Sequence, residues 1–188
     1  MVPAFVPFVP GRRRRARAAA LPDDVRRALA DAPPPPLAAP LLVAAGAGVV
    51  AAVTIAAAVW SSLPERVPTH FGADGQADGW GGKGSLLILP AMAALMFAVL
   101  TLAARSPASF NYPFPLTKDN APRQAALATL LLAWLRLAVV WLFVGVEWGV
   151  VAGARGGSDG LGIWFLPATL LLVGLPVAAY LVAAWRAR

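Results

Sequence analysis

Long apolar stretches dominate the hydrophobic pattern along the chain. Four mostly apolar runs cover residues 37–60, 85–104, 124–151 and 161–185. A helix needs about 20 such residues to cross the hydrocarbon core of a bilayer, and each run reaches that length. Because lipid offers no partner for backbone amides, each run must satisfy its own backbone as a helix. The pattern therefore predicts an all-α polytopic membrane protein with four transmembrane helices.

The composition agrees with a membrane protein. Hydrophobic residues make up 59% of the 188 residues, charged residues 13%, and the mean hydropathy is +0.69. A water-soluble domain of this length carries more charge. The formal net charge of +7 does not indicate a nucleic-acid partner, because the basic residues gather beside the apolar runs. The chain has no cysteine, which excludes disulfides, thiol nucleophiles and Cys-ligated metals.

The basic residues predict the orientation of the helices. Arg and Lys are concentrated in cytoplasmic segments of membrane proteins. Three basic residues lie in the segments that follow the first and third runs: Arg66, Lys83 and Arg155. Twelve lie on the other side: Arg12, Arg13, Arg14, Arg15, Arg17, Arg26, Arg27, Arg105, Lys118, Arg123, Arg186 and Arg188. We therefore expect both termini in the cytoplasm, with the protein as a multi-pass component of the plasma membrane.

Residues 1–36 form a basic, proline-rich leader ahead of the transmembrane domain of residues 37–188. Residues 21–32 are expected to form a short helix with Pro22 in its first turn, and residues 33–36 a stiff proline spacer. The arginines of the cluster Arg12–Arg17 have two interpretations. They fix the topology, which we favour, or they also hold the leader on anionic lipid.

The outer loop, residues 61–84, has the most distinctive composition of the chain. Two prolines favour an extended entry, and several glycines allow tight turns. The polar and aromatic candidates lie in two short groups: Pro68, Thr69, His70, Phe71 and Gly72, then Asp78, Gly79, Trp80 and Lys83. Such a loop either caps the helix ends or binds a peptide or protein ligand. Both interpretations stay open on the sequence.

Metal binding at this loop is not favoured. Asp74, Gln76, Asp78 and Gly79 follow the beginning of a calcium-binding loop, but position 12 is Ser85 where a bidentate glutamate is needed. One histidine and two aspartates are too few for a typical zinc site. We expect no metal, no cofactor and no catalytic residue.

The inner loop, residues 105–123, contains a second group of candidates. Its extended part includes Asn111, Tyr112 and Pro113, and Thr117 follows. Asn120 is expected to cap the third helix, with Pro122 in its first turn and Gln124 just beyond.

Two charges lie inside the third run. Arg136 and Glu147 are eleven residues apart, so they project from nearly the same face, about 16 Å apart along the axis. Intramembrane charges usually face the helix bundle, so we expect Arg136 to point inward rather than snorkel to the headgroups. Glu147 is expected near the outer interface, within reach of the loop that carries His70.

Small residues recur every four positions in the first run, at Ala44, Gly48 and Ala52. This pattern allows helices to approach closely. It serves either a contact within the monomer or a homodimer, and the sequence does not distinguish them.

The motif residues resemble a known domain family. Leu63-Pro64, Val67 to Phe71 and Asp78 to Gly81 with Lys83 are similar to the uncharacterised membrane domain family numbered 1648, and the inner-loop residues Asn111 to Gln124 agree. That domain also occurs in proteins that resemble the bacterial immunity protein against a sporulation-delaying toxin (SdpI-like proteins). The resemblance covers roughly residues 42–140. It implies a relative but no mechanism.

Three functional hypotheses follow. We favour a non-catalytic sensing or immunity-type protein whose outer loop binds a ligand or partner. The first alternative is a subunit or small carrier of a membrane transport system that uses Arg136 and Glu147. The second is a cell-envelope enzyme, although the sequence offers no paired catalytic constellation.

Overall fold

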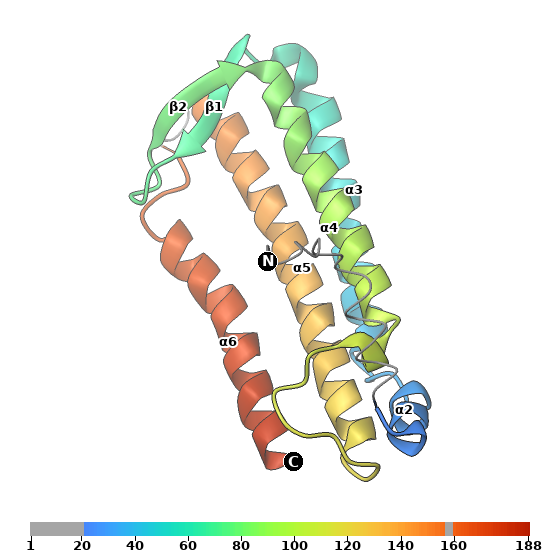
Figure 1. Ribbon diagram of the computed structural model, residues 1–188. Helices are drawn as coiled ribbons and strands as arrows, with labels where there is room; N and C mark the ends of the chain where they lie inside the picture. Colours follow the sequence, from blue (N-terminus) through green and yellow to red (C-terminus); the bar gives the residue numbers. More distant parts are fainter. Residues whose placement is uncertain (1–20, 157–159) are drawn as a thin grey trace, which may run out of the picture.

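The computed structural model describes residues 21–156 and 160–188, and the cluster Arg12–Arg17 lies outside them. Helix α2 (Asp23–Ala30) precedes the four long helices (Figure 1). These are α3 (Ala38–Val59), α4 (Ile88–Ala104), α5 (Ala121–Ala154) and α6 (Phe165–Arg186). The strands β1 (Arg66–Phe71) and β2 (Ala77–Gly82) lie between α3 and α4.

All four long helices are long and apolar enough to cross a membrane, which confirms the four predicted spans. Their outward surfaces carry many exposed leucine and valine side chains, as expected for contact with lipid rather than water. Exposed tryptophans near helix ends, including Trp148, Trp164 and Trp185, suit the headgroup layer.

Several helix boundaries differ from the prediction. The third span begins at Ala121 rather than at residue 124 and ends at Ala154, because Pro122 is accepted in the first turn of a helix and Arg123 continues it. The fourth begins at Phe165 rather than at residue 161. Gly160 and Gly162 have positive φ, a conformation that ends regular helix, and they place Leu161 against the hairpin instead.

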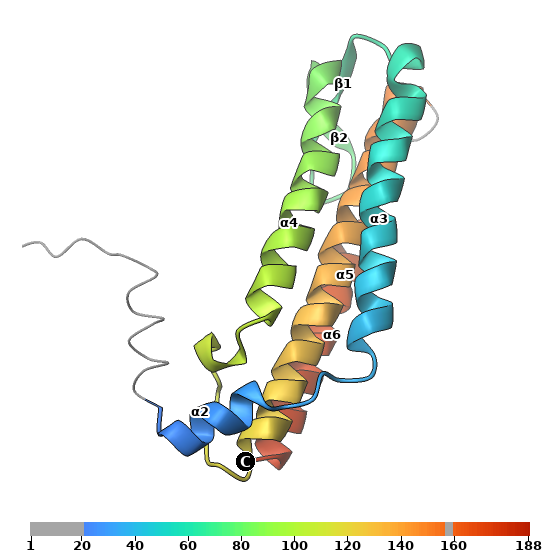
Figure 2. The same cartoon turned by 90° about the vertical axis from the view of Figure 1, so that its right-hand side faces the viewer.

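Helix α5 is the central element of the bundle. It packs against α3 and α4 along its length, and α3 and α4 also contact each other (Figure 2). Gly48 of α3 lies so close to α5 that a Cβ there would be 2.7 Å from Cγ1 of Val140. The Trp141 indole N–H donates to the Ala44 carbonyl at 3.0 Å. The small-residue pattern of α3 is therefore used for a contact within the monomer.

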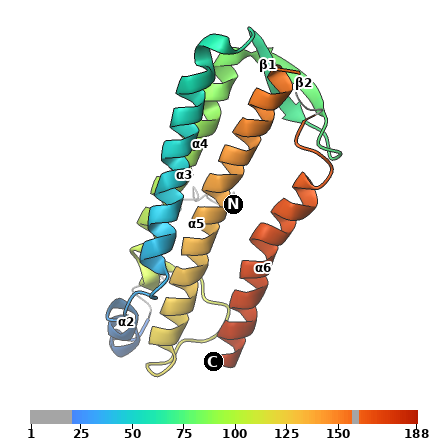
Figure 3. The same ribbon diagram turned by 180° about the vertical axis from the view of Figure 1, so that it is seen from behind.

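Helix α6 is peripheral. It packs against α5, and Ala184 is its one buried residue in the described part of the chain (Figure 3). The amide of Gln124 donates to the Ala184 carbonyl at 2.8 Å, which fixes the C-terminal end of α6 against the beginning of α5. The rest of α6 presents exposed leucines to the surroundings.

The outer loop is not irregular but forms an antiparallel hairpin of β1 and β2 at one end of the bundle. The all-α prediction is correct for the membrane part and omits this hairpin. The register shifts between Pro68 and His70, which leaves Thr69 without a partner in register, and shifts again before Phe71. We call this end of the molecule the hairpin end and the other the opposite end.

At the opposite end, α2 packs on the first turns of α5. Val25 and Leu29 are buried against Ala121 and Ala125, with Tyr112 and Leu116 of the connecting segment around them. The charged residues of α2 remain on its outer face, and Arg26 pairs with Asp23. The expected short amphipathic helix is present, with Pro22 just before its first residue rather than in its first turn.

Gly48 gives a test of the α3–α5 contact. We expect Gly48→Ala to lower the melting temperature in detergent, because overpacking costs about 1–3 kcal/mol. Gly46→Ala is the matched control: its Cβ would be 3.9 Å from the Phe97 ring, an ordinary contact, and it receives the same gain in helix propensity. Equal melting temperatures for the two variants would contradict this packing.

Candidate functional site at the hairpin

The turn of the hairpin has a defined conformation. The Gly72 amide donates to the Gln76 carbonyl at 2.8 Å, and the Gly75 amide to the Gly72 carbonyl at 2.9 Å. The Asp74 carboxylate accepts from the Gln76 amide at 3.0 Å, an aspartate turn. Gly75 has φ +79°, which favours glycine. The glycines thus serve a fixed turn rather than a loose loop.

The tip of the hairpin is attached to the segment between α5 and α6. Leu161 donates its amide to the Gly75 carbonyl at 2.8 Å, and Gln76 forms an isolated antiparallel bridge with Gly160. A Cβ at Gly75 would lie 2.4 Å from the Gly162 carbonyl oxygen. No sequence pattern indicates this contact, because it joins segments about 85 residues apart and uses backbone atoms.

The inner side of the hairpin closes an apolar core. Val67 and Leu63 are buried with residues from the neighbouring helices: Ala56, Val59, Leu86, Val150 and Val151. Pro68 packs over Gly153 of α5, where a Cβ would lie 3.2 Å from Cγ of the proline. Burial of this apolar surface stabilises the packing of β1 on the ends of α3 and α5.

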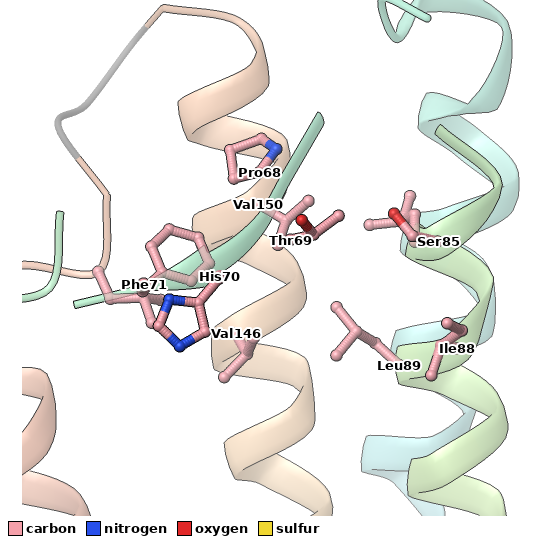
Figure 4. Close-up of a pocket in the computed structure, with 11 residues that line it drawn as sticks. Pro68, Thr69, His70, Phe71, Ser85, Ile88, Leu89, Val146 and Val150 are labelled. Atoms are coloured by element: carbon pink, nitrogen blue, oxygen red, sulfur yellow. The ribbon is translucent and has the colours of Figure 1, made fainter. Parts of the chain in front are cut away.

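A pocket of about 390 Å³ lies between β1, the beginning of α4 and one face of α5. Figure 4 shows Pro68 to Phe71 on one side, Val146 and Val150 as the floor, and Ser85, Ile88 and Leu89 on the far side. Leu86 and Leu161 complete the lining. Thr69 and His70 are exposed, whereas most other lining residues are apolar, so the pocket combines a polar rim with an apolar interior.

The glycines of the motif leave space for the side chains of β1. A Cβ at Gly79 would lie 2.9 Å from the His70 Cβ, and one at Gly81 would lie 2.8 Å from the Thr69 Cγ2. Gly82 has no neighbour within 4 Å of its Cβ position. Gly79 and Gly81 therefore allow Thr69 and His70 to lie across β2, and the two halves of the motif are structurally dependent on each other.

Polar pairs join the motif residues on the outer side of the hairpin. His70 Nδ1 lies 2.5 Å from the Asp78 carboxylate, and both side chains are more than half exposed. Lys83 Nζ lies 2.8 Å from the Glu65 carboxylate and 5.5 Å from the centre of the Trp60 ring. The exposed His70–Asp78 pair adds little stability, about 0–1 kcal/mol, whereas Lys83 of the second pair is only 25% exposed at its side chain. The contribution of the two pairs is to orient the rim.

Asp74 and Asp78 both have partners within the hairpin, in the turn and on His70. No group of three or more His, Asp or Glu residues that could hold a metal occurs within residues 21–156 and 160–188.

The inner-loop candidates lie at the opposite end, away from this pocket. Asn120 occupies the N-cap position of α5 but bonds to no helix amide there; its side chain accepts from the Thr117 amide at 2.9 Å and donates to the Pro115 carbonyl at 3.1 Å. Asn120 therefore lies at the predicted N-cap position, but its side chain closes the turn before the helix instead of bonding to a helix amide. Asn111 and Pro113 are exposed in the same segment.

Tyr112 stabilises the connection between α4 and α5. Its hydroxyl donates to the Pro107 carbonyl at 3.1 Å, and its ring packs against the cluster around Leu29. Burial raises the pKa of the Tyr112 phenol, and the nearby Tyr180 raises it further. These contacts give the inner-loop motif a role in holding α2, the connecting segment and α5 together.

Arg136 and Glu147 are both buried in the bundle, with exposures of 4% and 0%. Arg136 points inward as expected: it donates to the Thr101 hydroxyl at 3.4 Å and lies 5.8 Å from the Phe97 ring centre. Glu147 is not among the residues that line the pocket, although Val146 and Val150 beside it are. No hydrogen bond joins it to His70 in the described structure.

Comparison with known proteins identifies a related domain. Residues 47–94 match the family described as "Domain of unknown function (DUF1648)". This match confirms the resemblance to domain family 1648 over most of α3, the hairpin and the first part of α4. The expected extension to residue 140 and the SdpI-like relation stay predictions.

A curated relative from Archaeoglobus fulgidus, described as "Uncharacterized protein", is 44% identical over 62 residues. The aligned segment covers 29% of this chain and 34% of that protein, so the chain matches about a third of its relative's length. No solved structure gives a significant match.

The packing of Thr69 on Gly81 can be tested by two substitutions, the second of which should compensate for the first. We expect Gly81→Ala to speed amide exchange in the hairpin by roughly tenfold, since overpacking costs about 1–3 kcal/mol. Thr69→Ser removes Cγ2 and should restore the protection in the double variant. Gly82→Ala, which meets no neighbour, is the control and should exchange like the wild type. Failure of Thr69→Ser to rescue Gly81→Ala would count against the contact.

Proposed function

We propose that this multi-pass membrane protein is a non-catalytic sensing or immunity-type protein of the bacterial plasma membrane, related to SdpI-like proteins, whose hairpin binds a peptide or protein ligand. The observation that carries this proposal is the pocket beneath β1. Four consecutive motif residues, Pro68 to Phe71, line it together with both neighbouring helices. A pocket with an apolar interior and a few polar groups at its rim is typical of a binding site.

The attachment of the hairpin supports a binding role. Its turn is internally bonded, its tip is bonded to Leu161, and its inner side is packed on α5. A surface that is ordered before the ligand arrives loses less conformational entropy on binding. Because the pocket is shared between β1, α4 and α5, a ligand there would contact both the hairpin and the membrane helices.

We place both termini in the cytoplasm and the hairpin outside. Among the described residues, the hairpin end has three basic and three acidic residues: Arg66, Lys83, Arg155, Glu65, Asp74 and Asp78. The opposite end has seven basic and four acidic residues: Arg26, Arg27, Arg105, Lys118, Arg123, Arg186, Arg188, Asp23, Asp24, Asp31 and Asp119. The excess of basic residues at the opposite end supports this orientation.

A transport role is the second candidate, favoured by the two buried charges of α5. Val140 and Val144 lie between Arg136 and Glu147 on the same helix and are themselves buried, at 0% and 9% exposure. Apolar residues in that position separate the two charges rather than joining them into one polar path. We therefore prefer binding at the hairpin.

Substitutions at the pocket test the binding role. Ile88 lines the pocket and is 59% exposed, so Ile88→Asp should fold while placing a charge where an apolar ligand group would lie. Leu87→Asp is the matched control, since Leu87 is 47% exposed and lies outside this pocket. Host cells that express each variant would be challenged with a panel of envelope-active peptides.

We expect the wild type and Leu87→Asp to protect the host against at least one peptide. Ile88→Asp should lose at least about tenfold in protective potency, because burying an isoleucine side chain contributes about 1.5–3 kcal/mol. Equal protection by both variants, or protection by none of the three proteins across the panel, would refute the proposed role.

The orientation has its own test, made simple because the natural chain has no cysteine. Ala73→Cys at the hairpin tip and Lys118→Cys in the opposite connection are both at exposed positions. On intact cells a membrane-impermeant maleimide should label Ala73→Cys, whereas Lys118→Cys should react only after permeabilisation. The reverse pattern would overturn the proposed orientation.

A further inference from the structure

Glu147 differs from the other charged side chains of the described structure. Its side chain is fully buried, at 0% exposure, and neither carboxyl oxygen has a hydrogen-bond partner within residues 21–156 and 160–188. A carboxylate is a strong acceptor that nearly always finds donors when it is buried. The group therefore requires a partner that the described residues do not provide.

No charged residue of the adjoining helices can neutralise Glu147. Helices α3 and α4 contain no charged residue within Ala38–Val59 and Ile88–Ala104. On α5 the nearest basic residues are Arg155 and Arg136, about 12 Å and 16 Å away along the axis. Arg155 donates to the Ser62 hydroxyl, and Arg136 donates to Thr101.

The charged groups of the hairpin end are engaged elsewhere or exposed. His70 pairs with Asp78, and Lys83 pairs with Glu65. Asp74 accepts from the turn, and Arg66 is exposed at the beginning of β1. The ionisable residues of α6, Tyr180 and Arg186, lie towards the opposite end of the bundle.

We propose that Glu147 is a proton-binding site inside the membrane bundle, occupied by a proton at neutral pH. A divalent cation needs several oxygen ligands, and the buried side chains of α3 and α4 toward the hairpin end are apolar: Ala52, Ala56, Val59, Pro90 and Ala93. A proton needs one oxygen. Binding it removes the charge whose burial would otherwise oppose folding.

The position of Glu147 connects this site to the hairpin. Val150 and Val151, one turn further along α5, belong to the core that seats β1, and Val146 and Val150 form the floor of the pocket. Loss of the proton would leave a charge that attracts water or displaces this part of α5. We expect the hairpin to be held firmly while the proton is bound and to loosen as the pH rises.

The composition of the chain allows a direct test of whether the Glu147 carboxyl is protonated. The sequence contains two glutamates, Glu65 and Glu147. In Glu65→Gln, glutamate labelled with ¹³C at its side-chain carboxyl reports Glu147 alone, with Glu147 itself unchanged. Glu65 is 85% exposed at its side chain, so this substitution should fold. Glu147→Gln leaves Glu65 as the solvated comparison.

In the full-length protein in bilayers at neutral pH, we expect the Glu65→Gln sample to show the ¹³C shift of a protonated carboxylic acid. The Glu147→Gln sample should show that of a carboxylate. A carboxylate shift from Glu147 at neutral pH would overturn the proposal. This readout involves no ligand, so its result is independent of whether the hairpin binds a peptide.

Coupling between the protonation of Glu147 and the stability of the hairpin is measured by amide hydrogen exchange. The measured rates are corrected for the intrinsic effect of pH on exchange. Raising the pH should reduce the protection of the β1 and β2 amides in the wild type. It should not do so in Glu147→Gln, which keeps a neutral side chain of the same shape. Glu147→Leu provides a second neutral variant should the glutamine not fold. The same pH dependence in the wild type and in a folded neutral variant would refute the coupling.

Discussion

The hydrocarbon solvent around the four long helices is the constraint on which the rest of the structure depends. Polar side chains inside such a bundle are stabilised when they find partners within it. The Gln124 amide reaches the Ala184 carbonyl, the Trp141 indole reaches the Ala44 carbonyl, and Arg136 reaches Thr101. Each of these bonds starts on α5 and ends on a different neighbouring helix. Helix α5 therefore organises the bundle through both its apolar surface and its polar groups.

The hairpin is the second structural unit, and it depends on close backbone approach. Gly75 lies against the segment at Gly162, and Gly79 and Gly81 leave space for His70 and Thr69. These contacts tie β1, β2 and the segment after α5 into one ordered surface. The apolar core beneath, with Val67 and Val150, joins that surface to the membrane helices. The hairpin therefore packs directly on the part of α5 that lies at the hairpin end.

The two ends of the molecule carry different groups of residues. The hairpin end carries the pocket, the motif residues and the buried carboxyl of Glu147 close to the same turns of α5. The opposite end carries the excess of basic residues and the cluster of α2, Tyr112 and the first turns of α5. Helix α6, with little buried surface, mainly covers one side of α5 and attaches the hairpin tip through the segment at Leu161.

The sequence by itself determined the four spans, because the length and apolarity of a membrane helix are local properties. It also predicted the motif residues as a group and the inward direction of Arg136. It did not reveal the hairpin: β2 is rich in glycine, and β1 has Pro68 in its middle, so neither resembles a typical strand. Only the tertiary structure brought Val146, Ile88 and Leu161 beside His70 and left Glu147 without a hydrogen-bond partner among the residues that it describes. The physical reason is that pockets and unpaired charges arise from contacts between distant segments, and apolar residues in a membrane helix look alike in sequence whether they face lipid or a pocket.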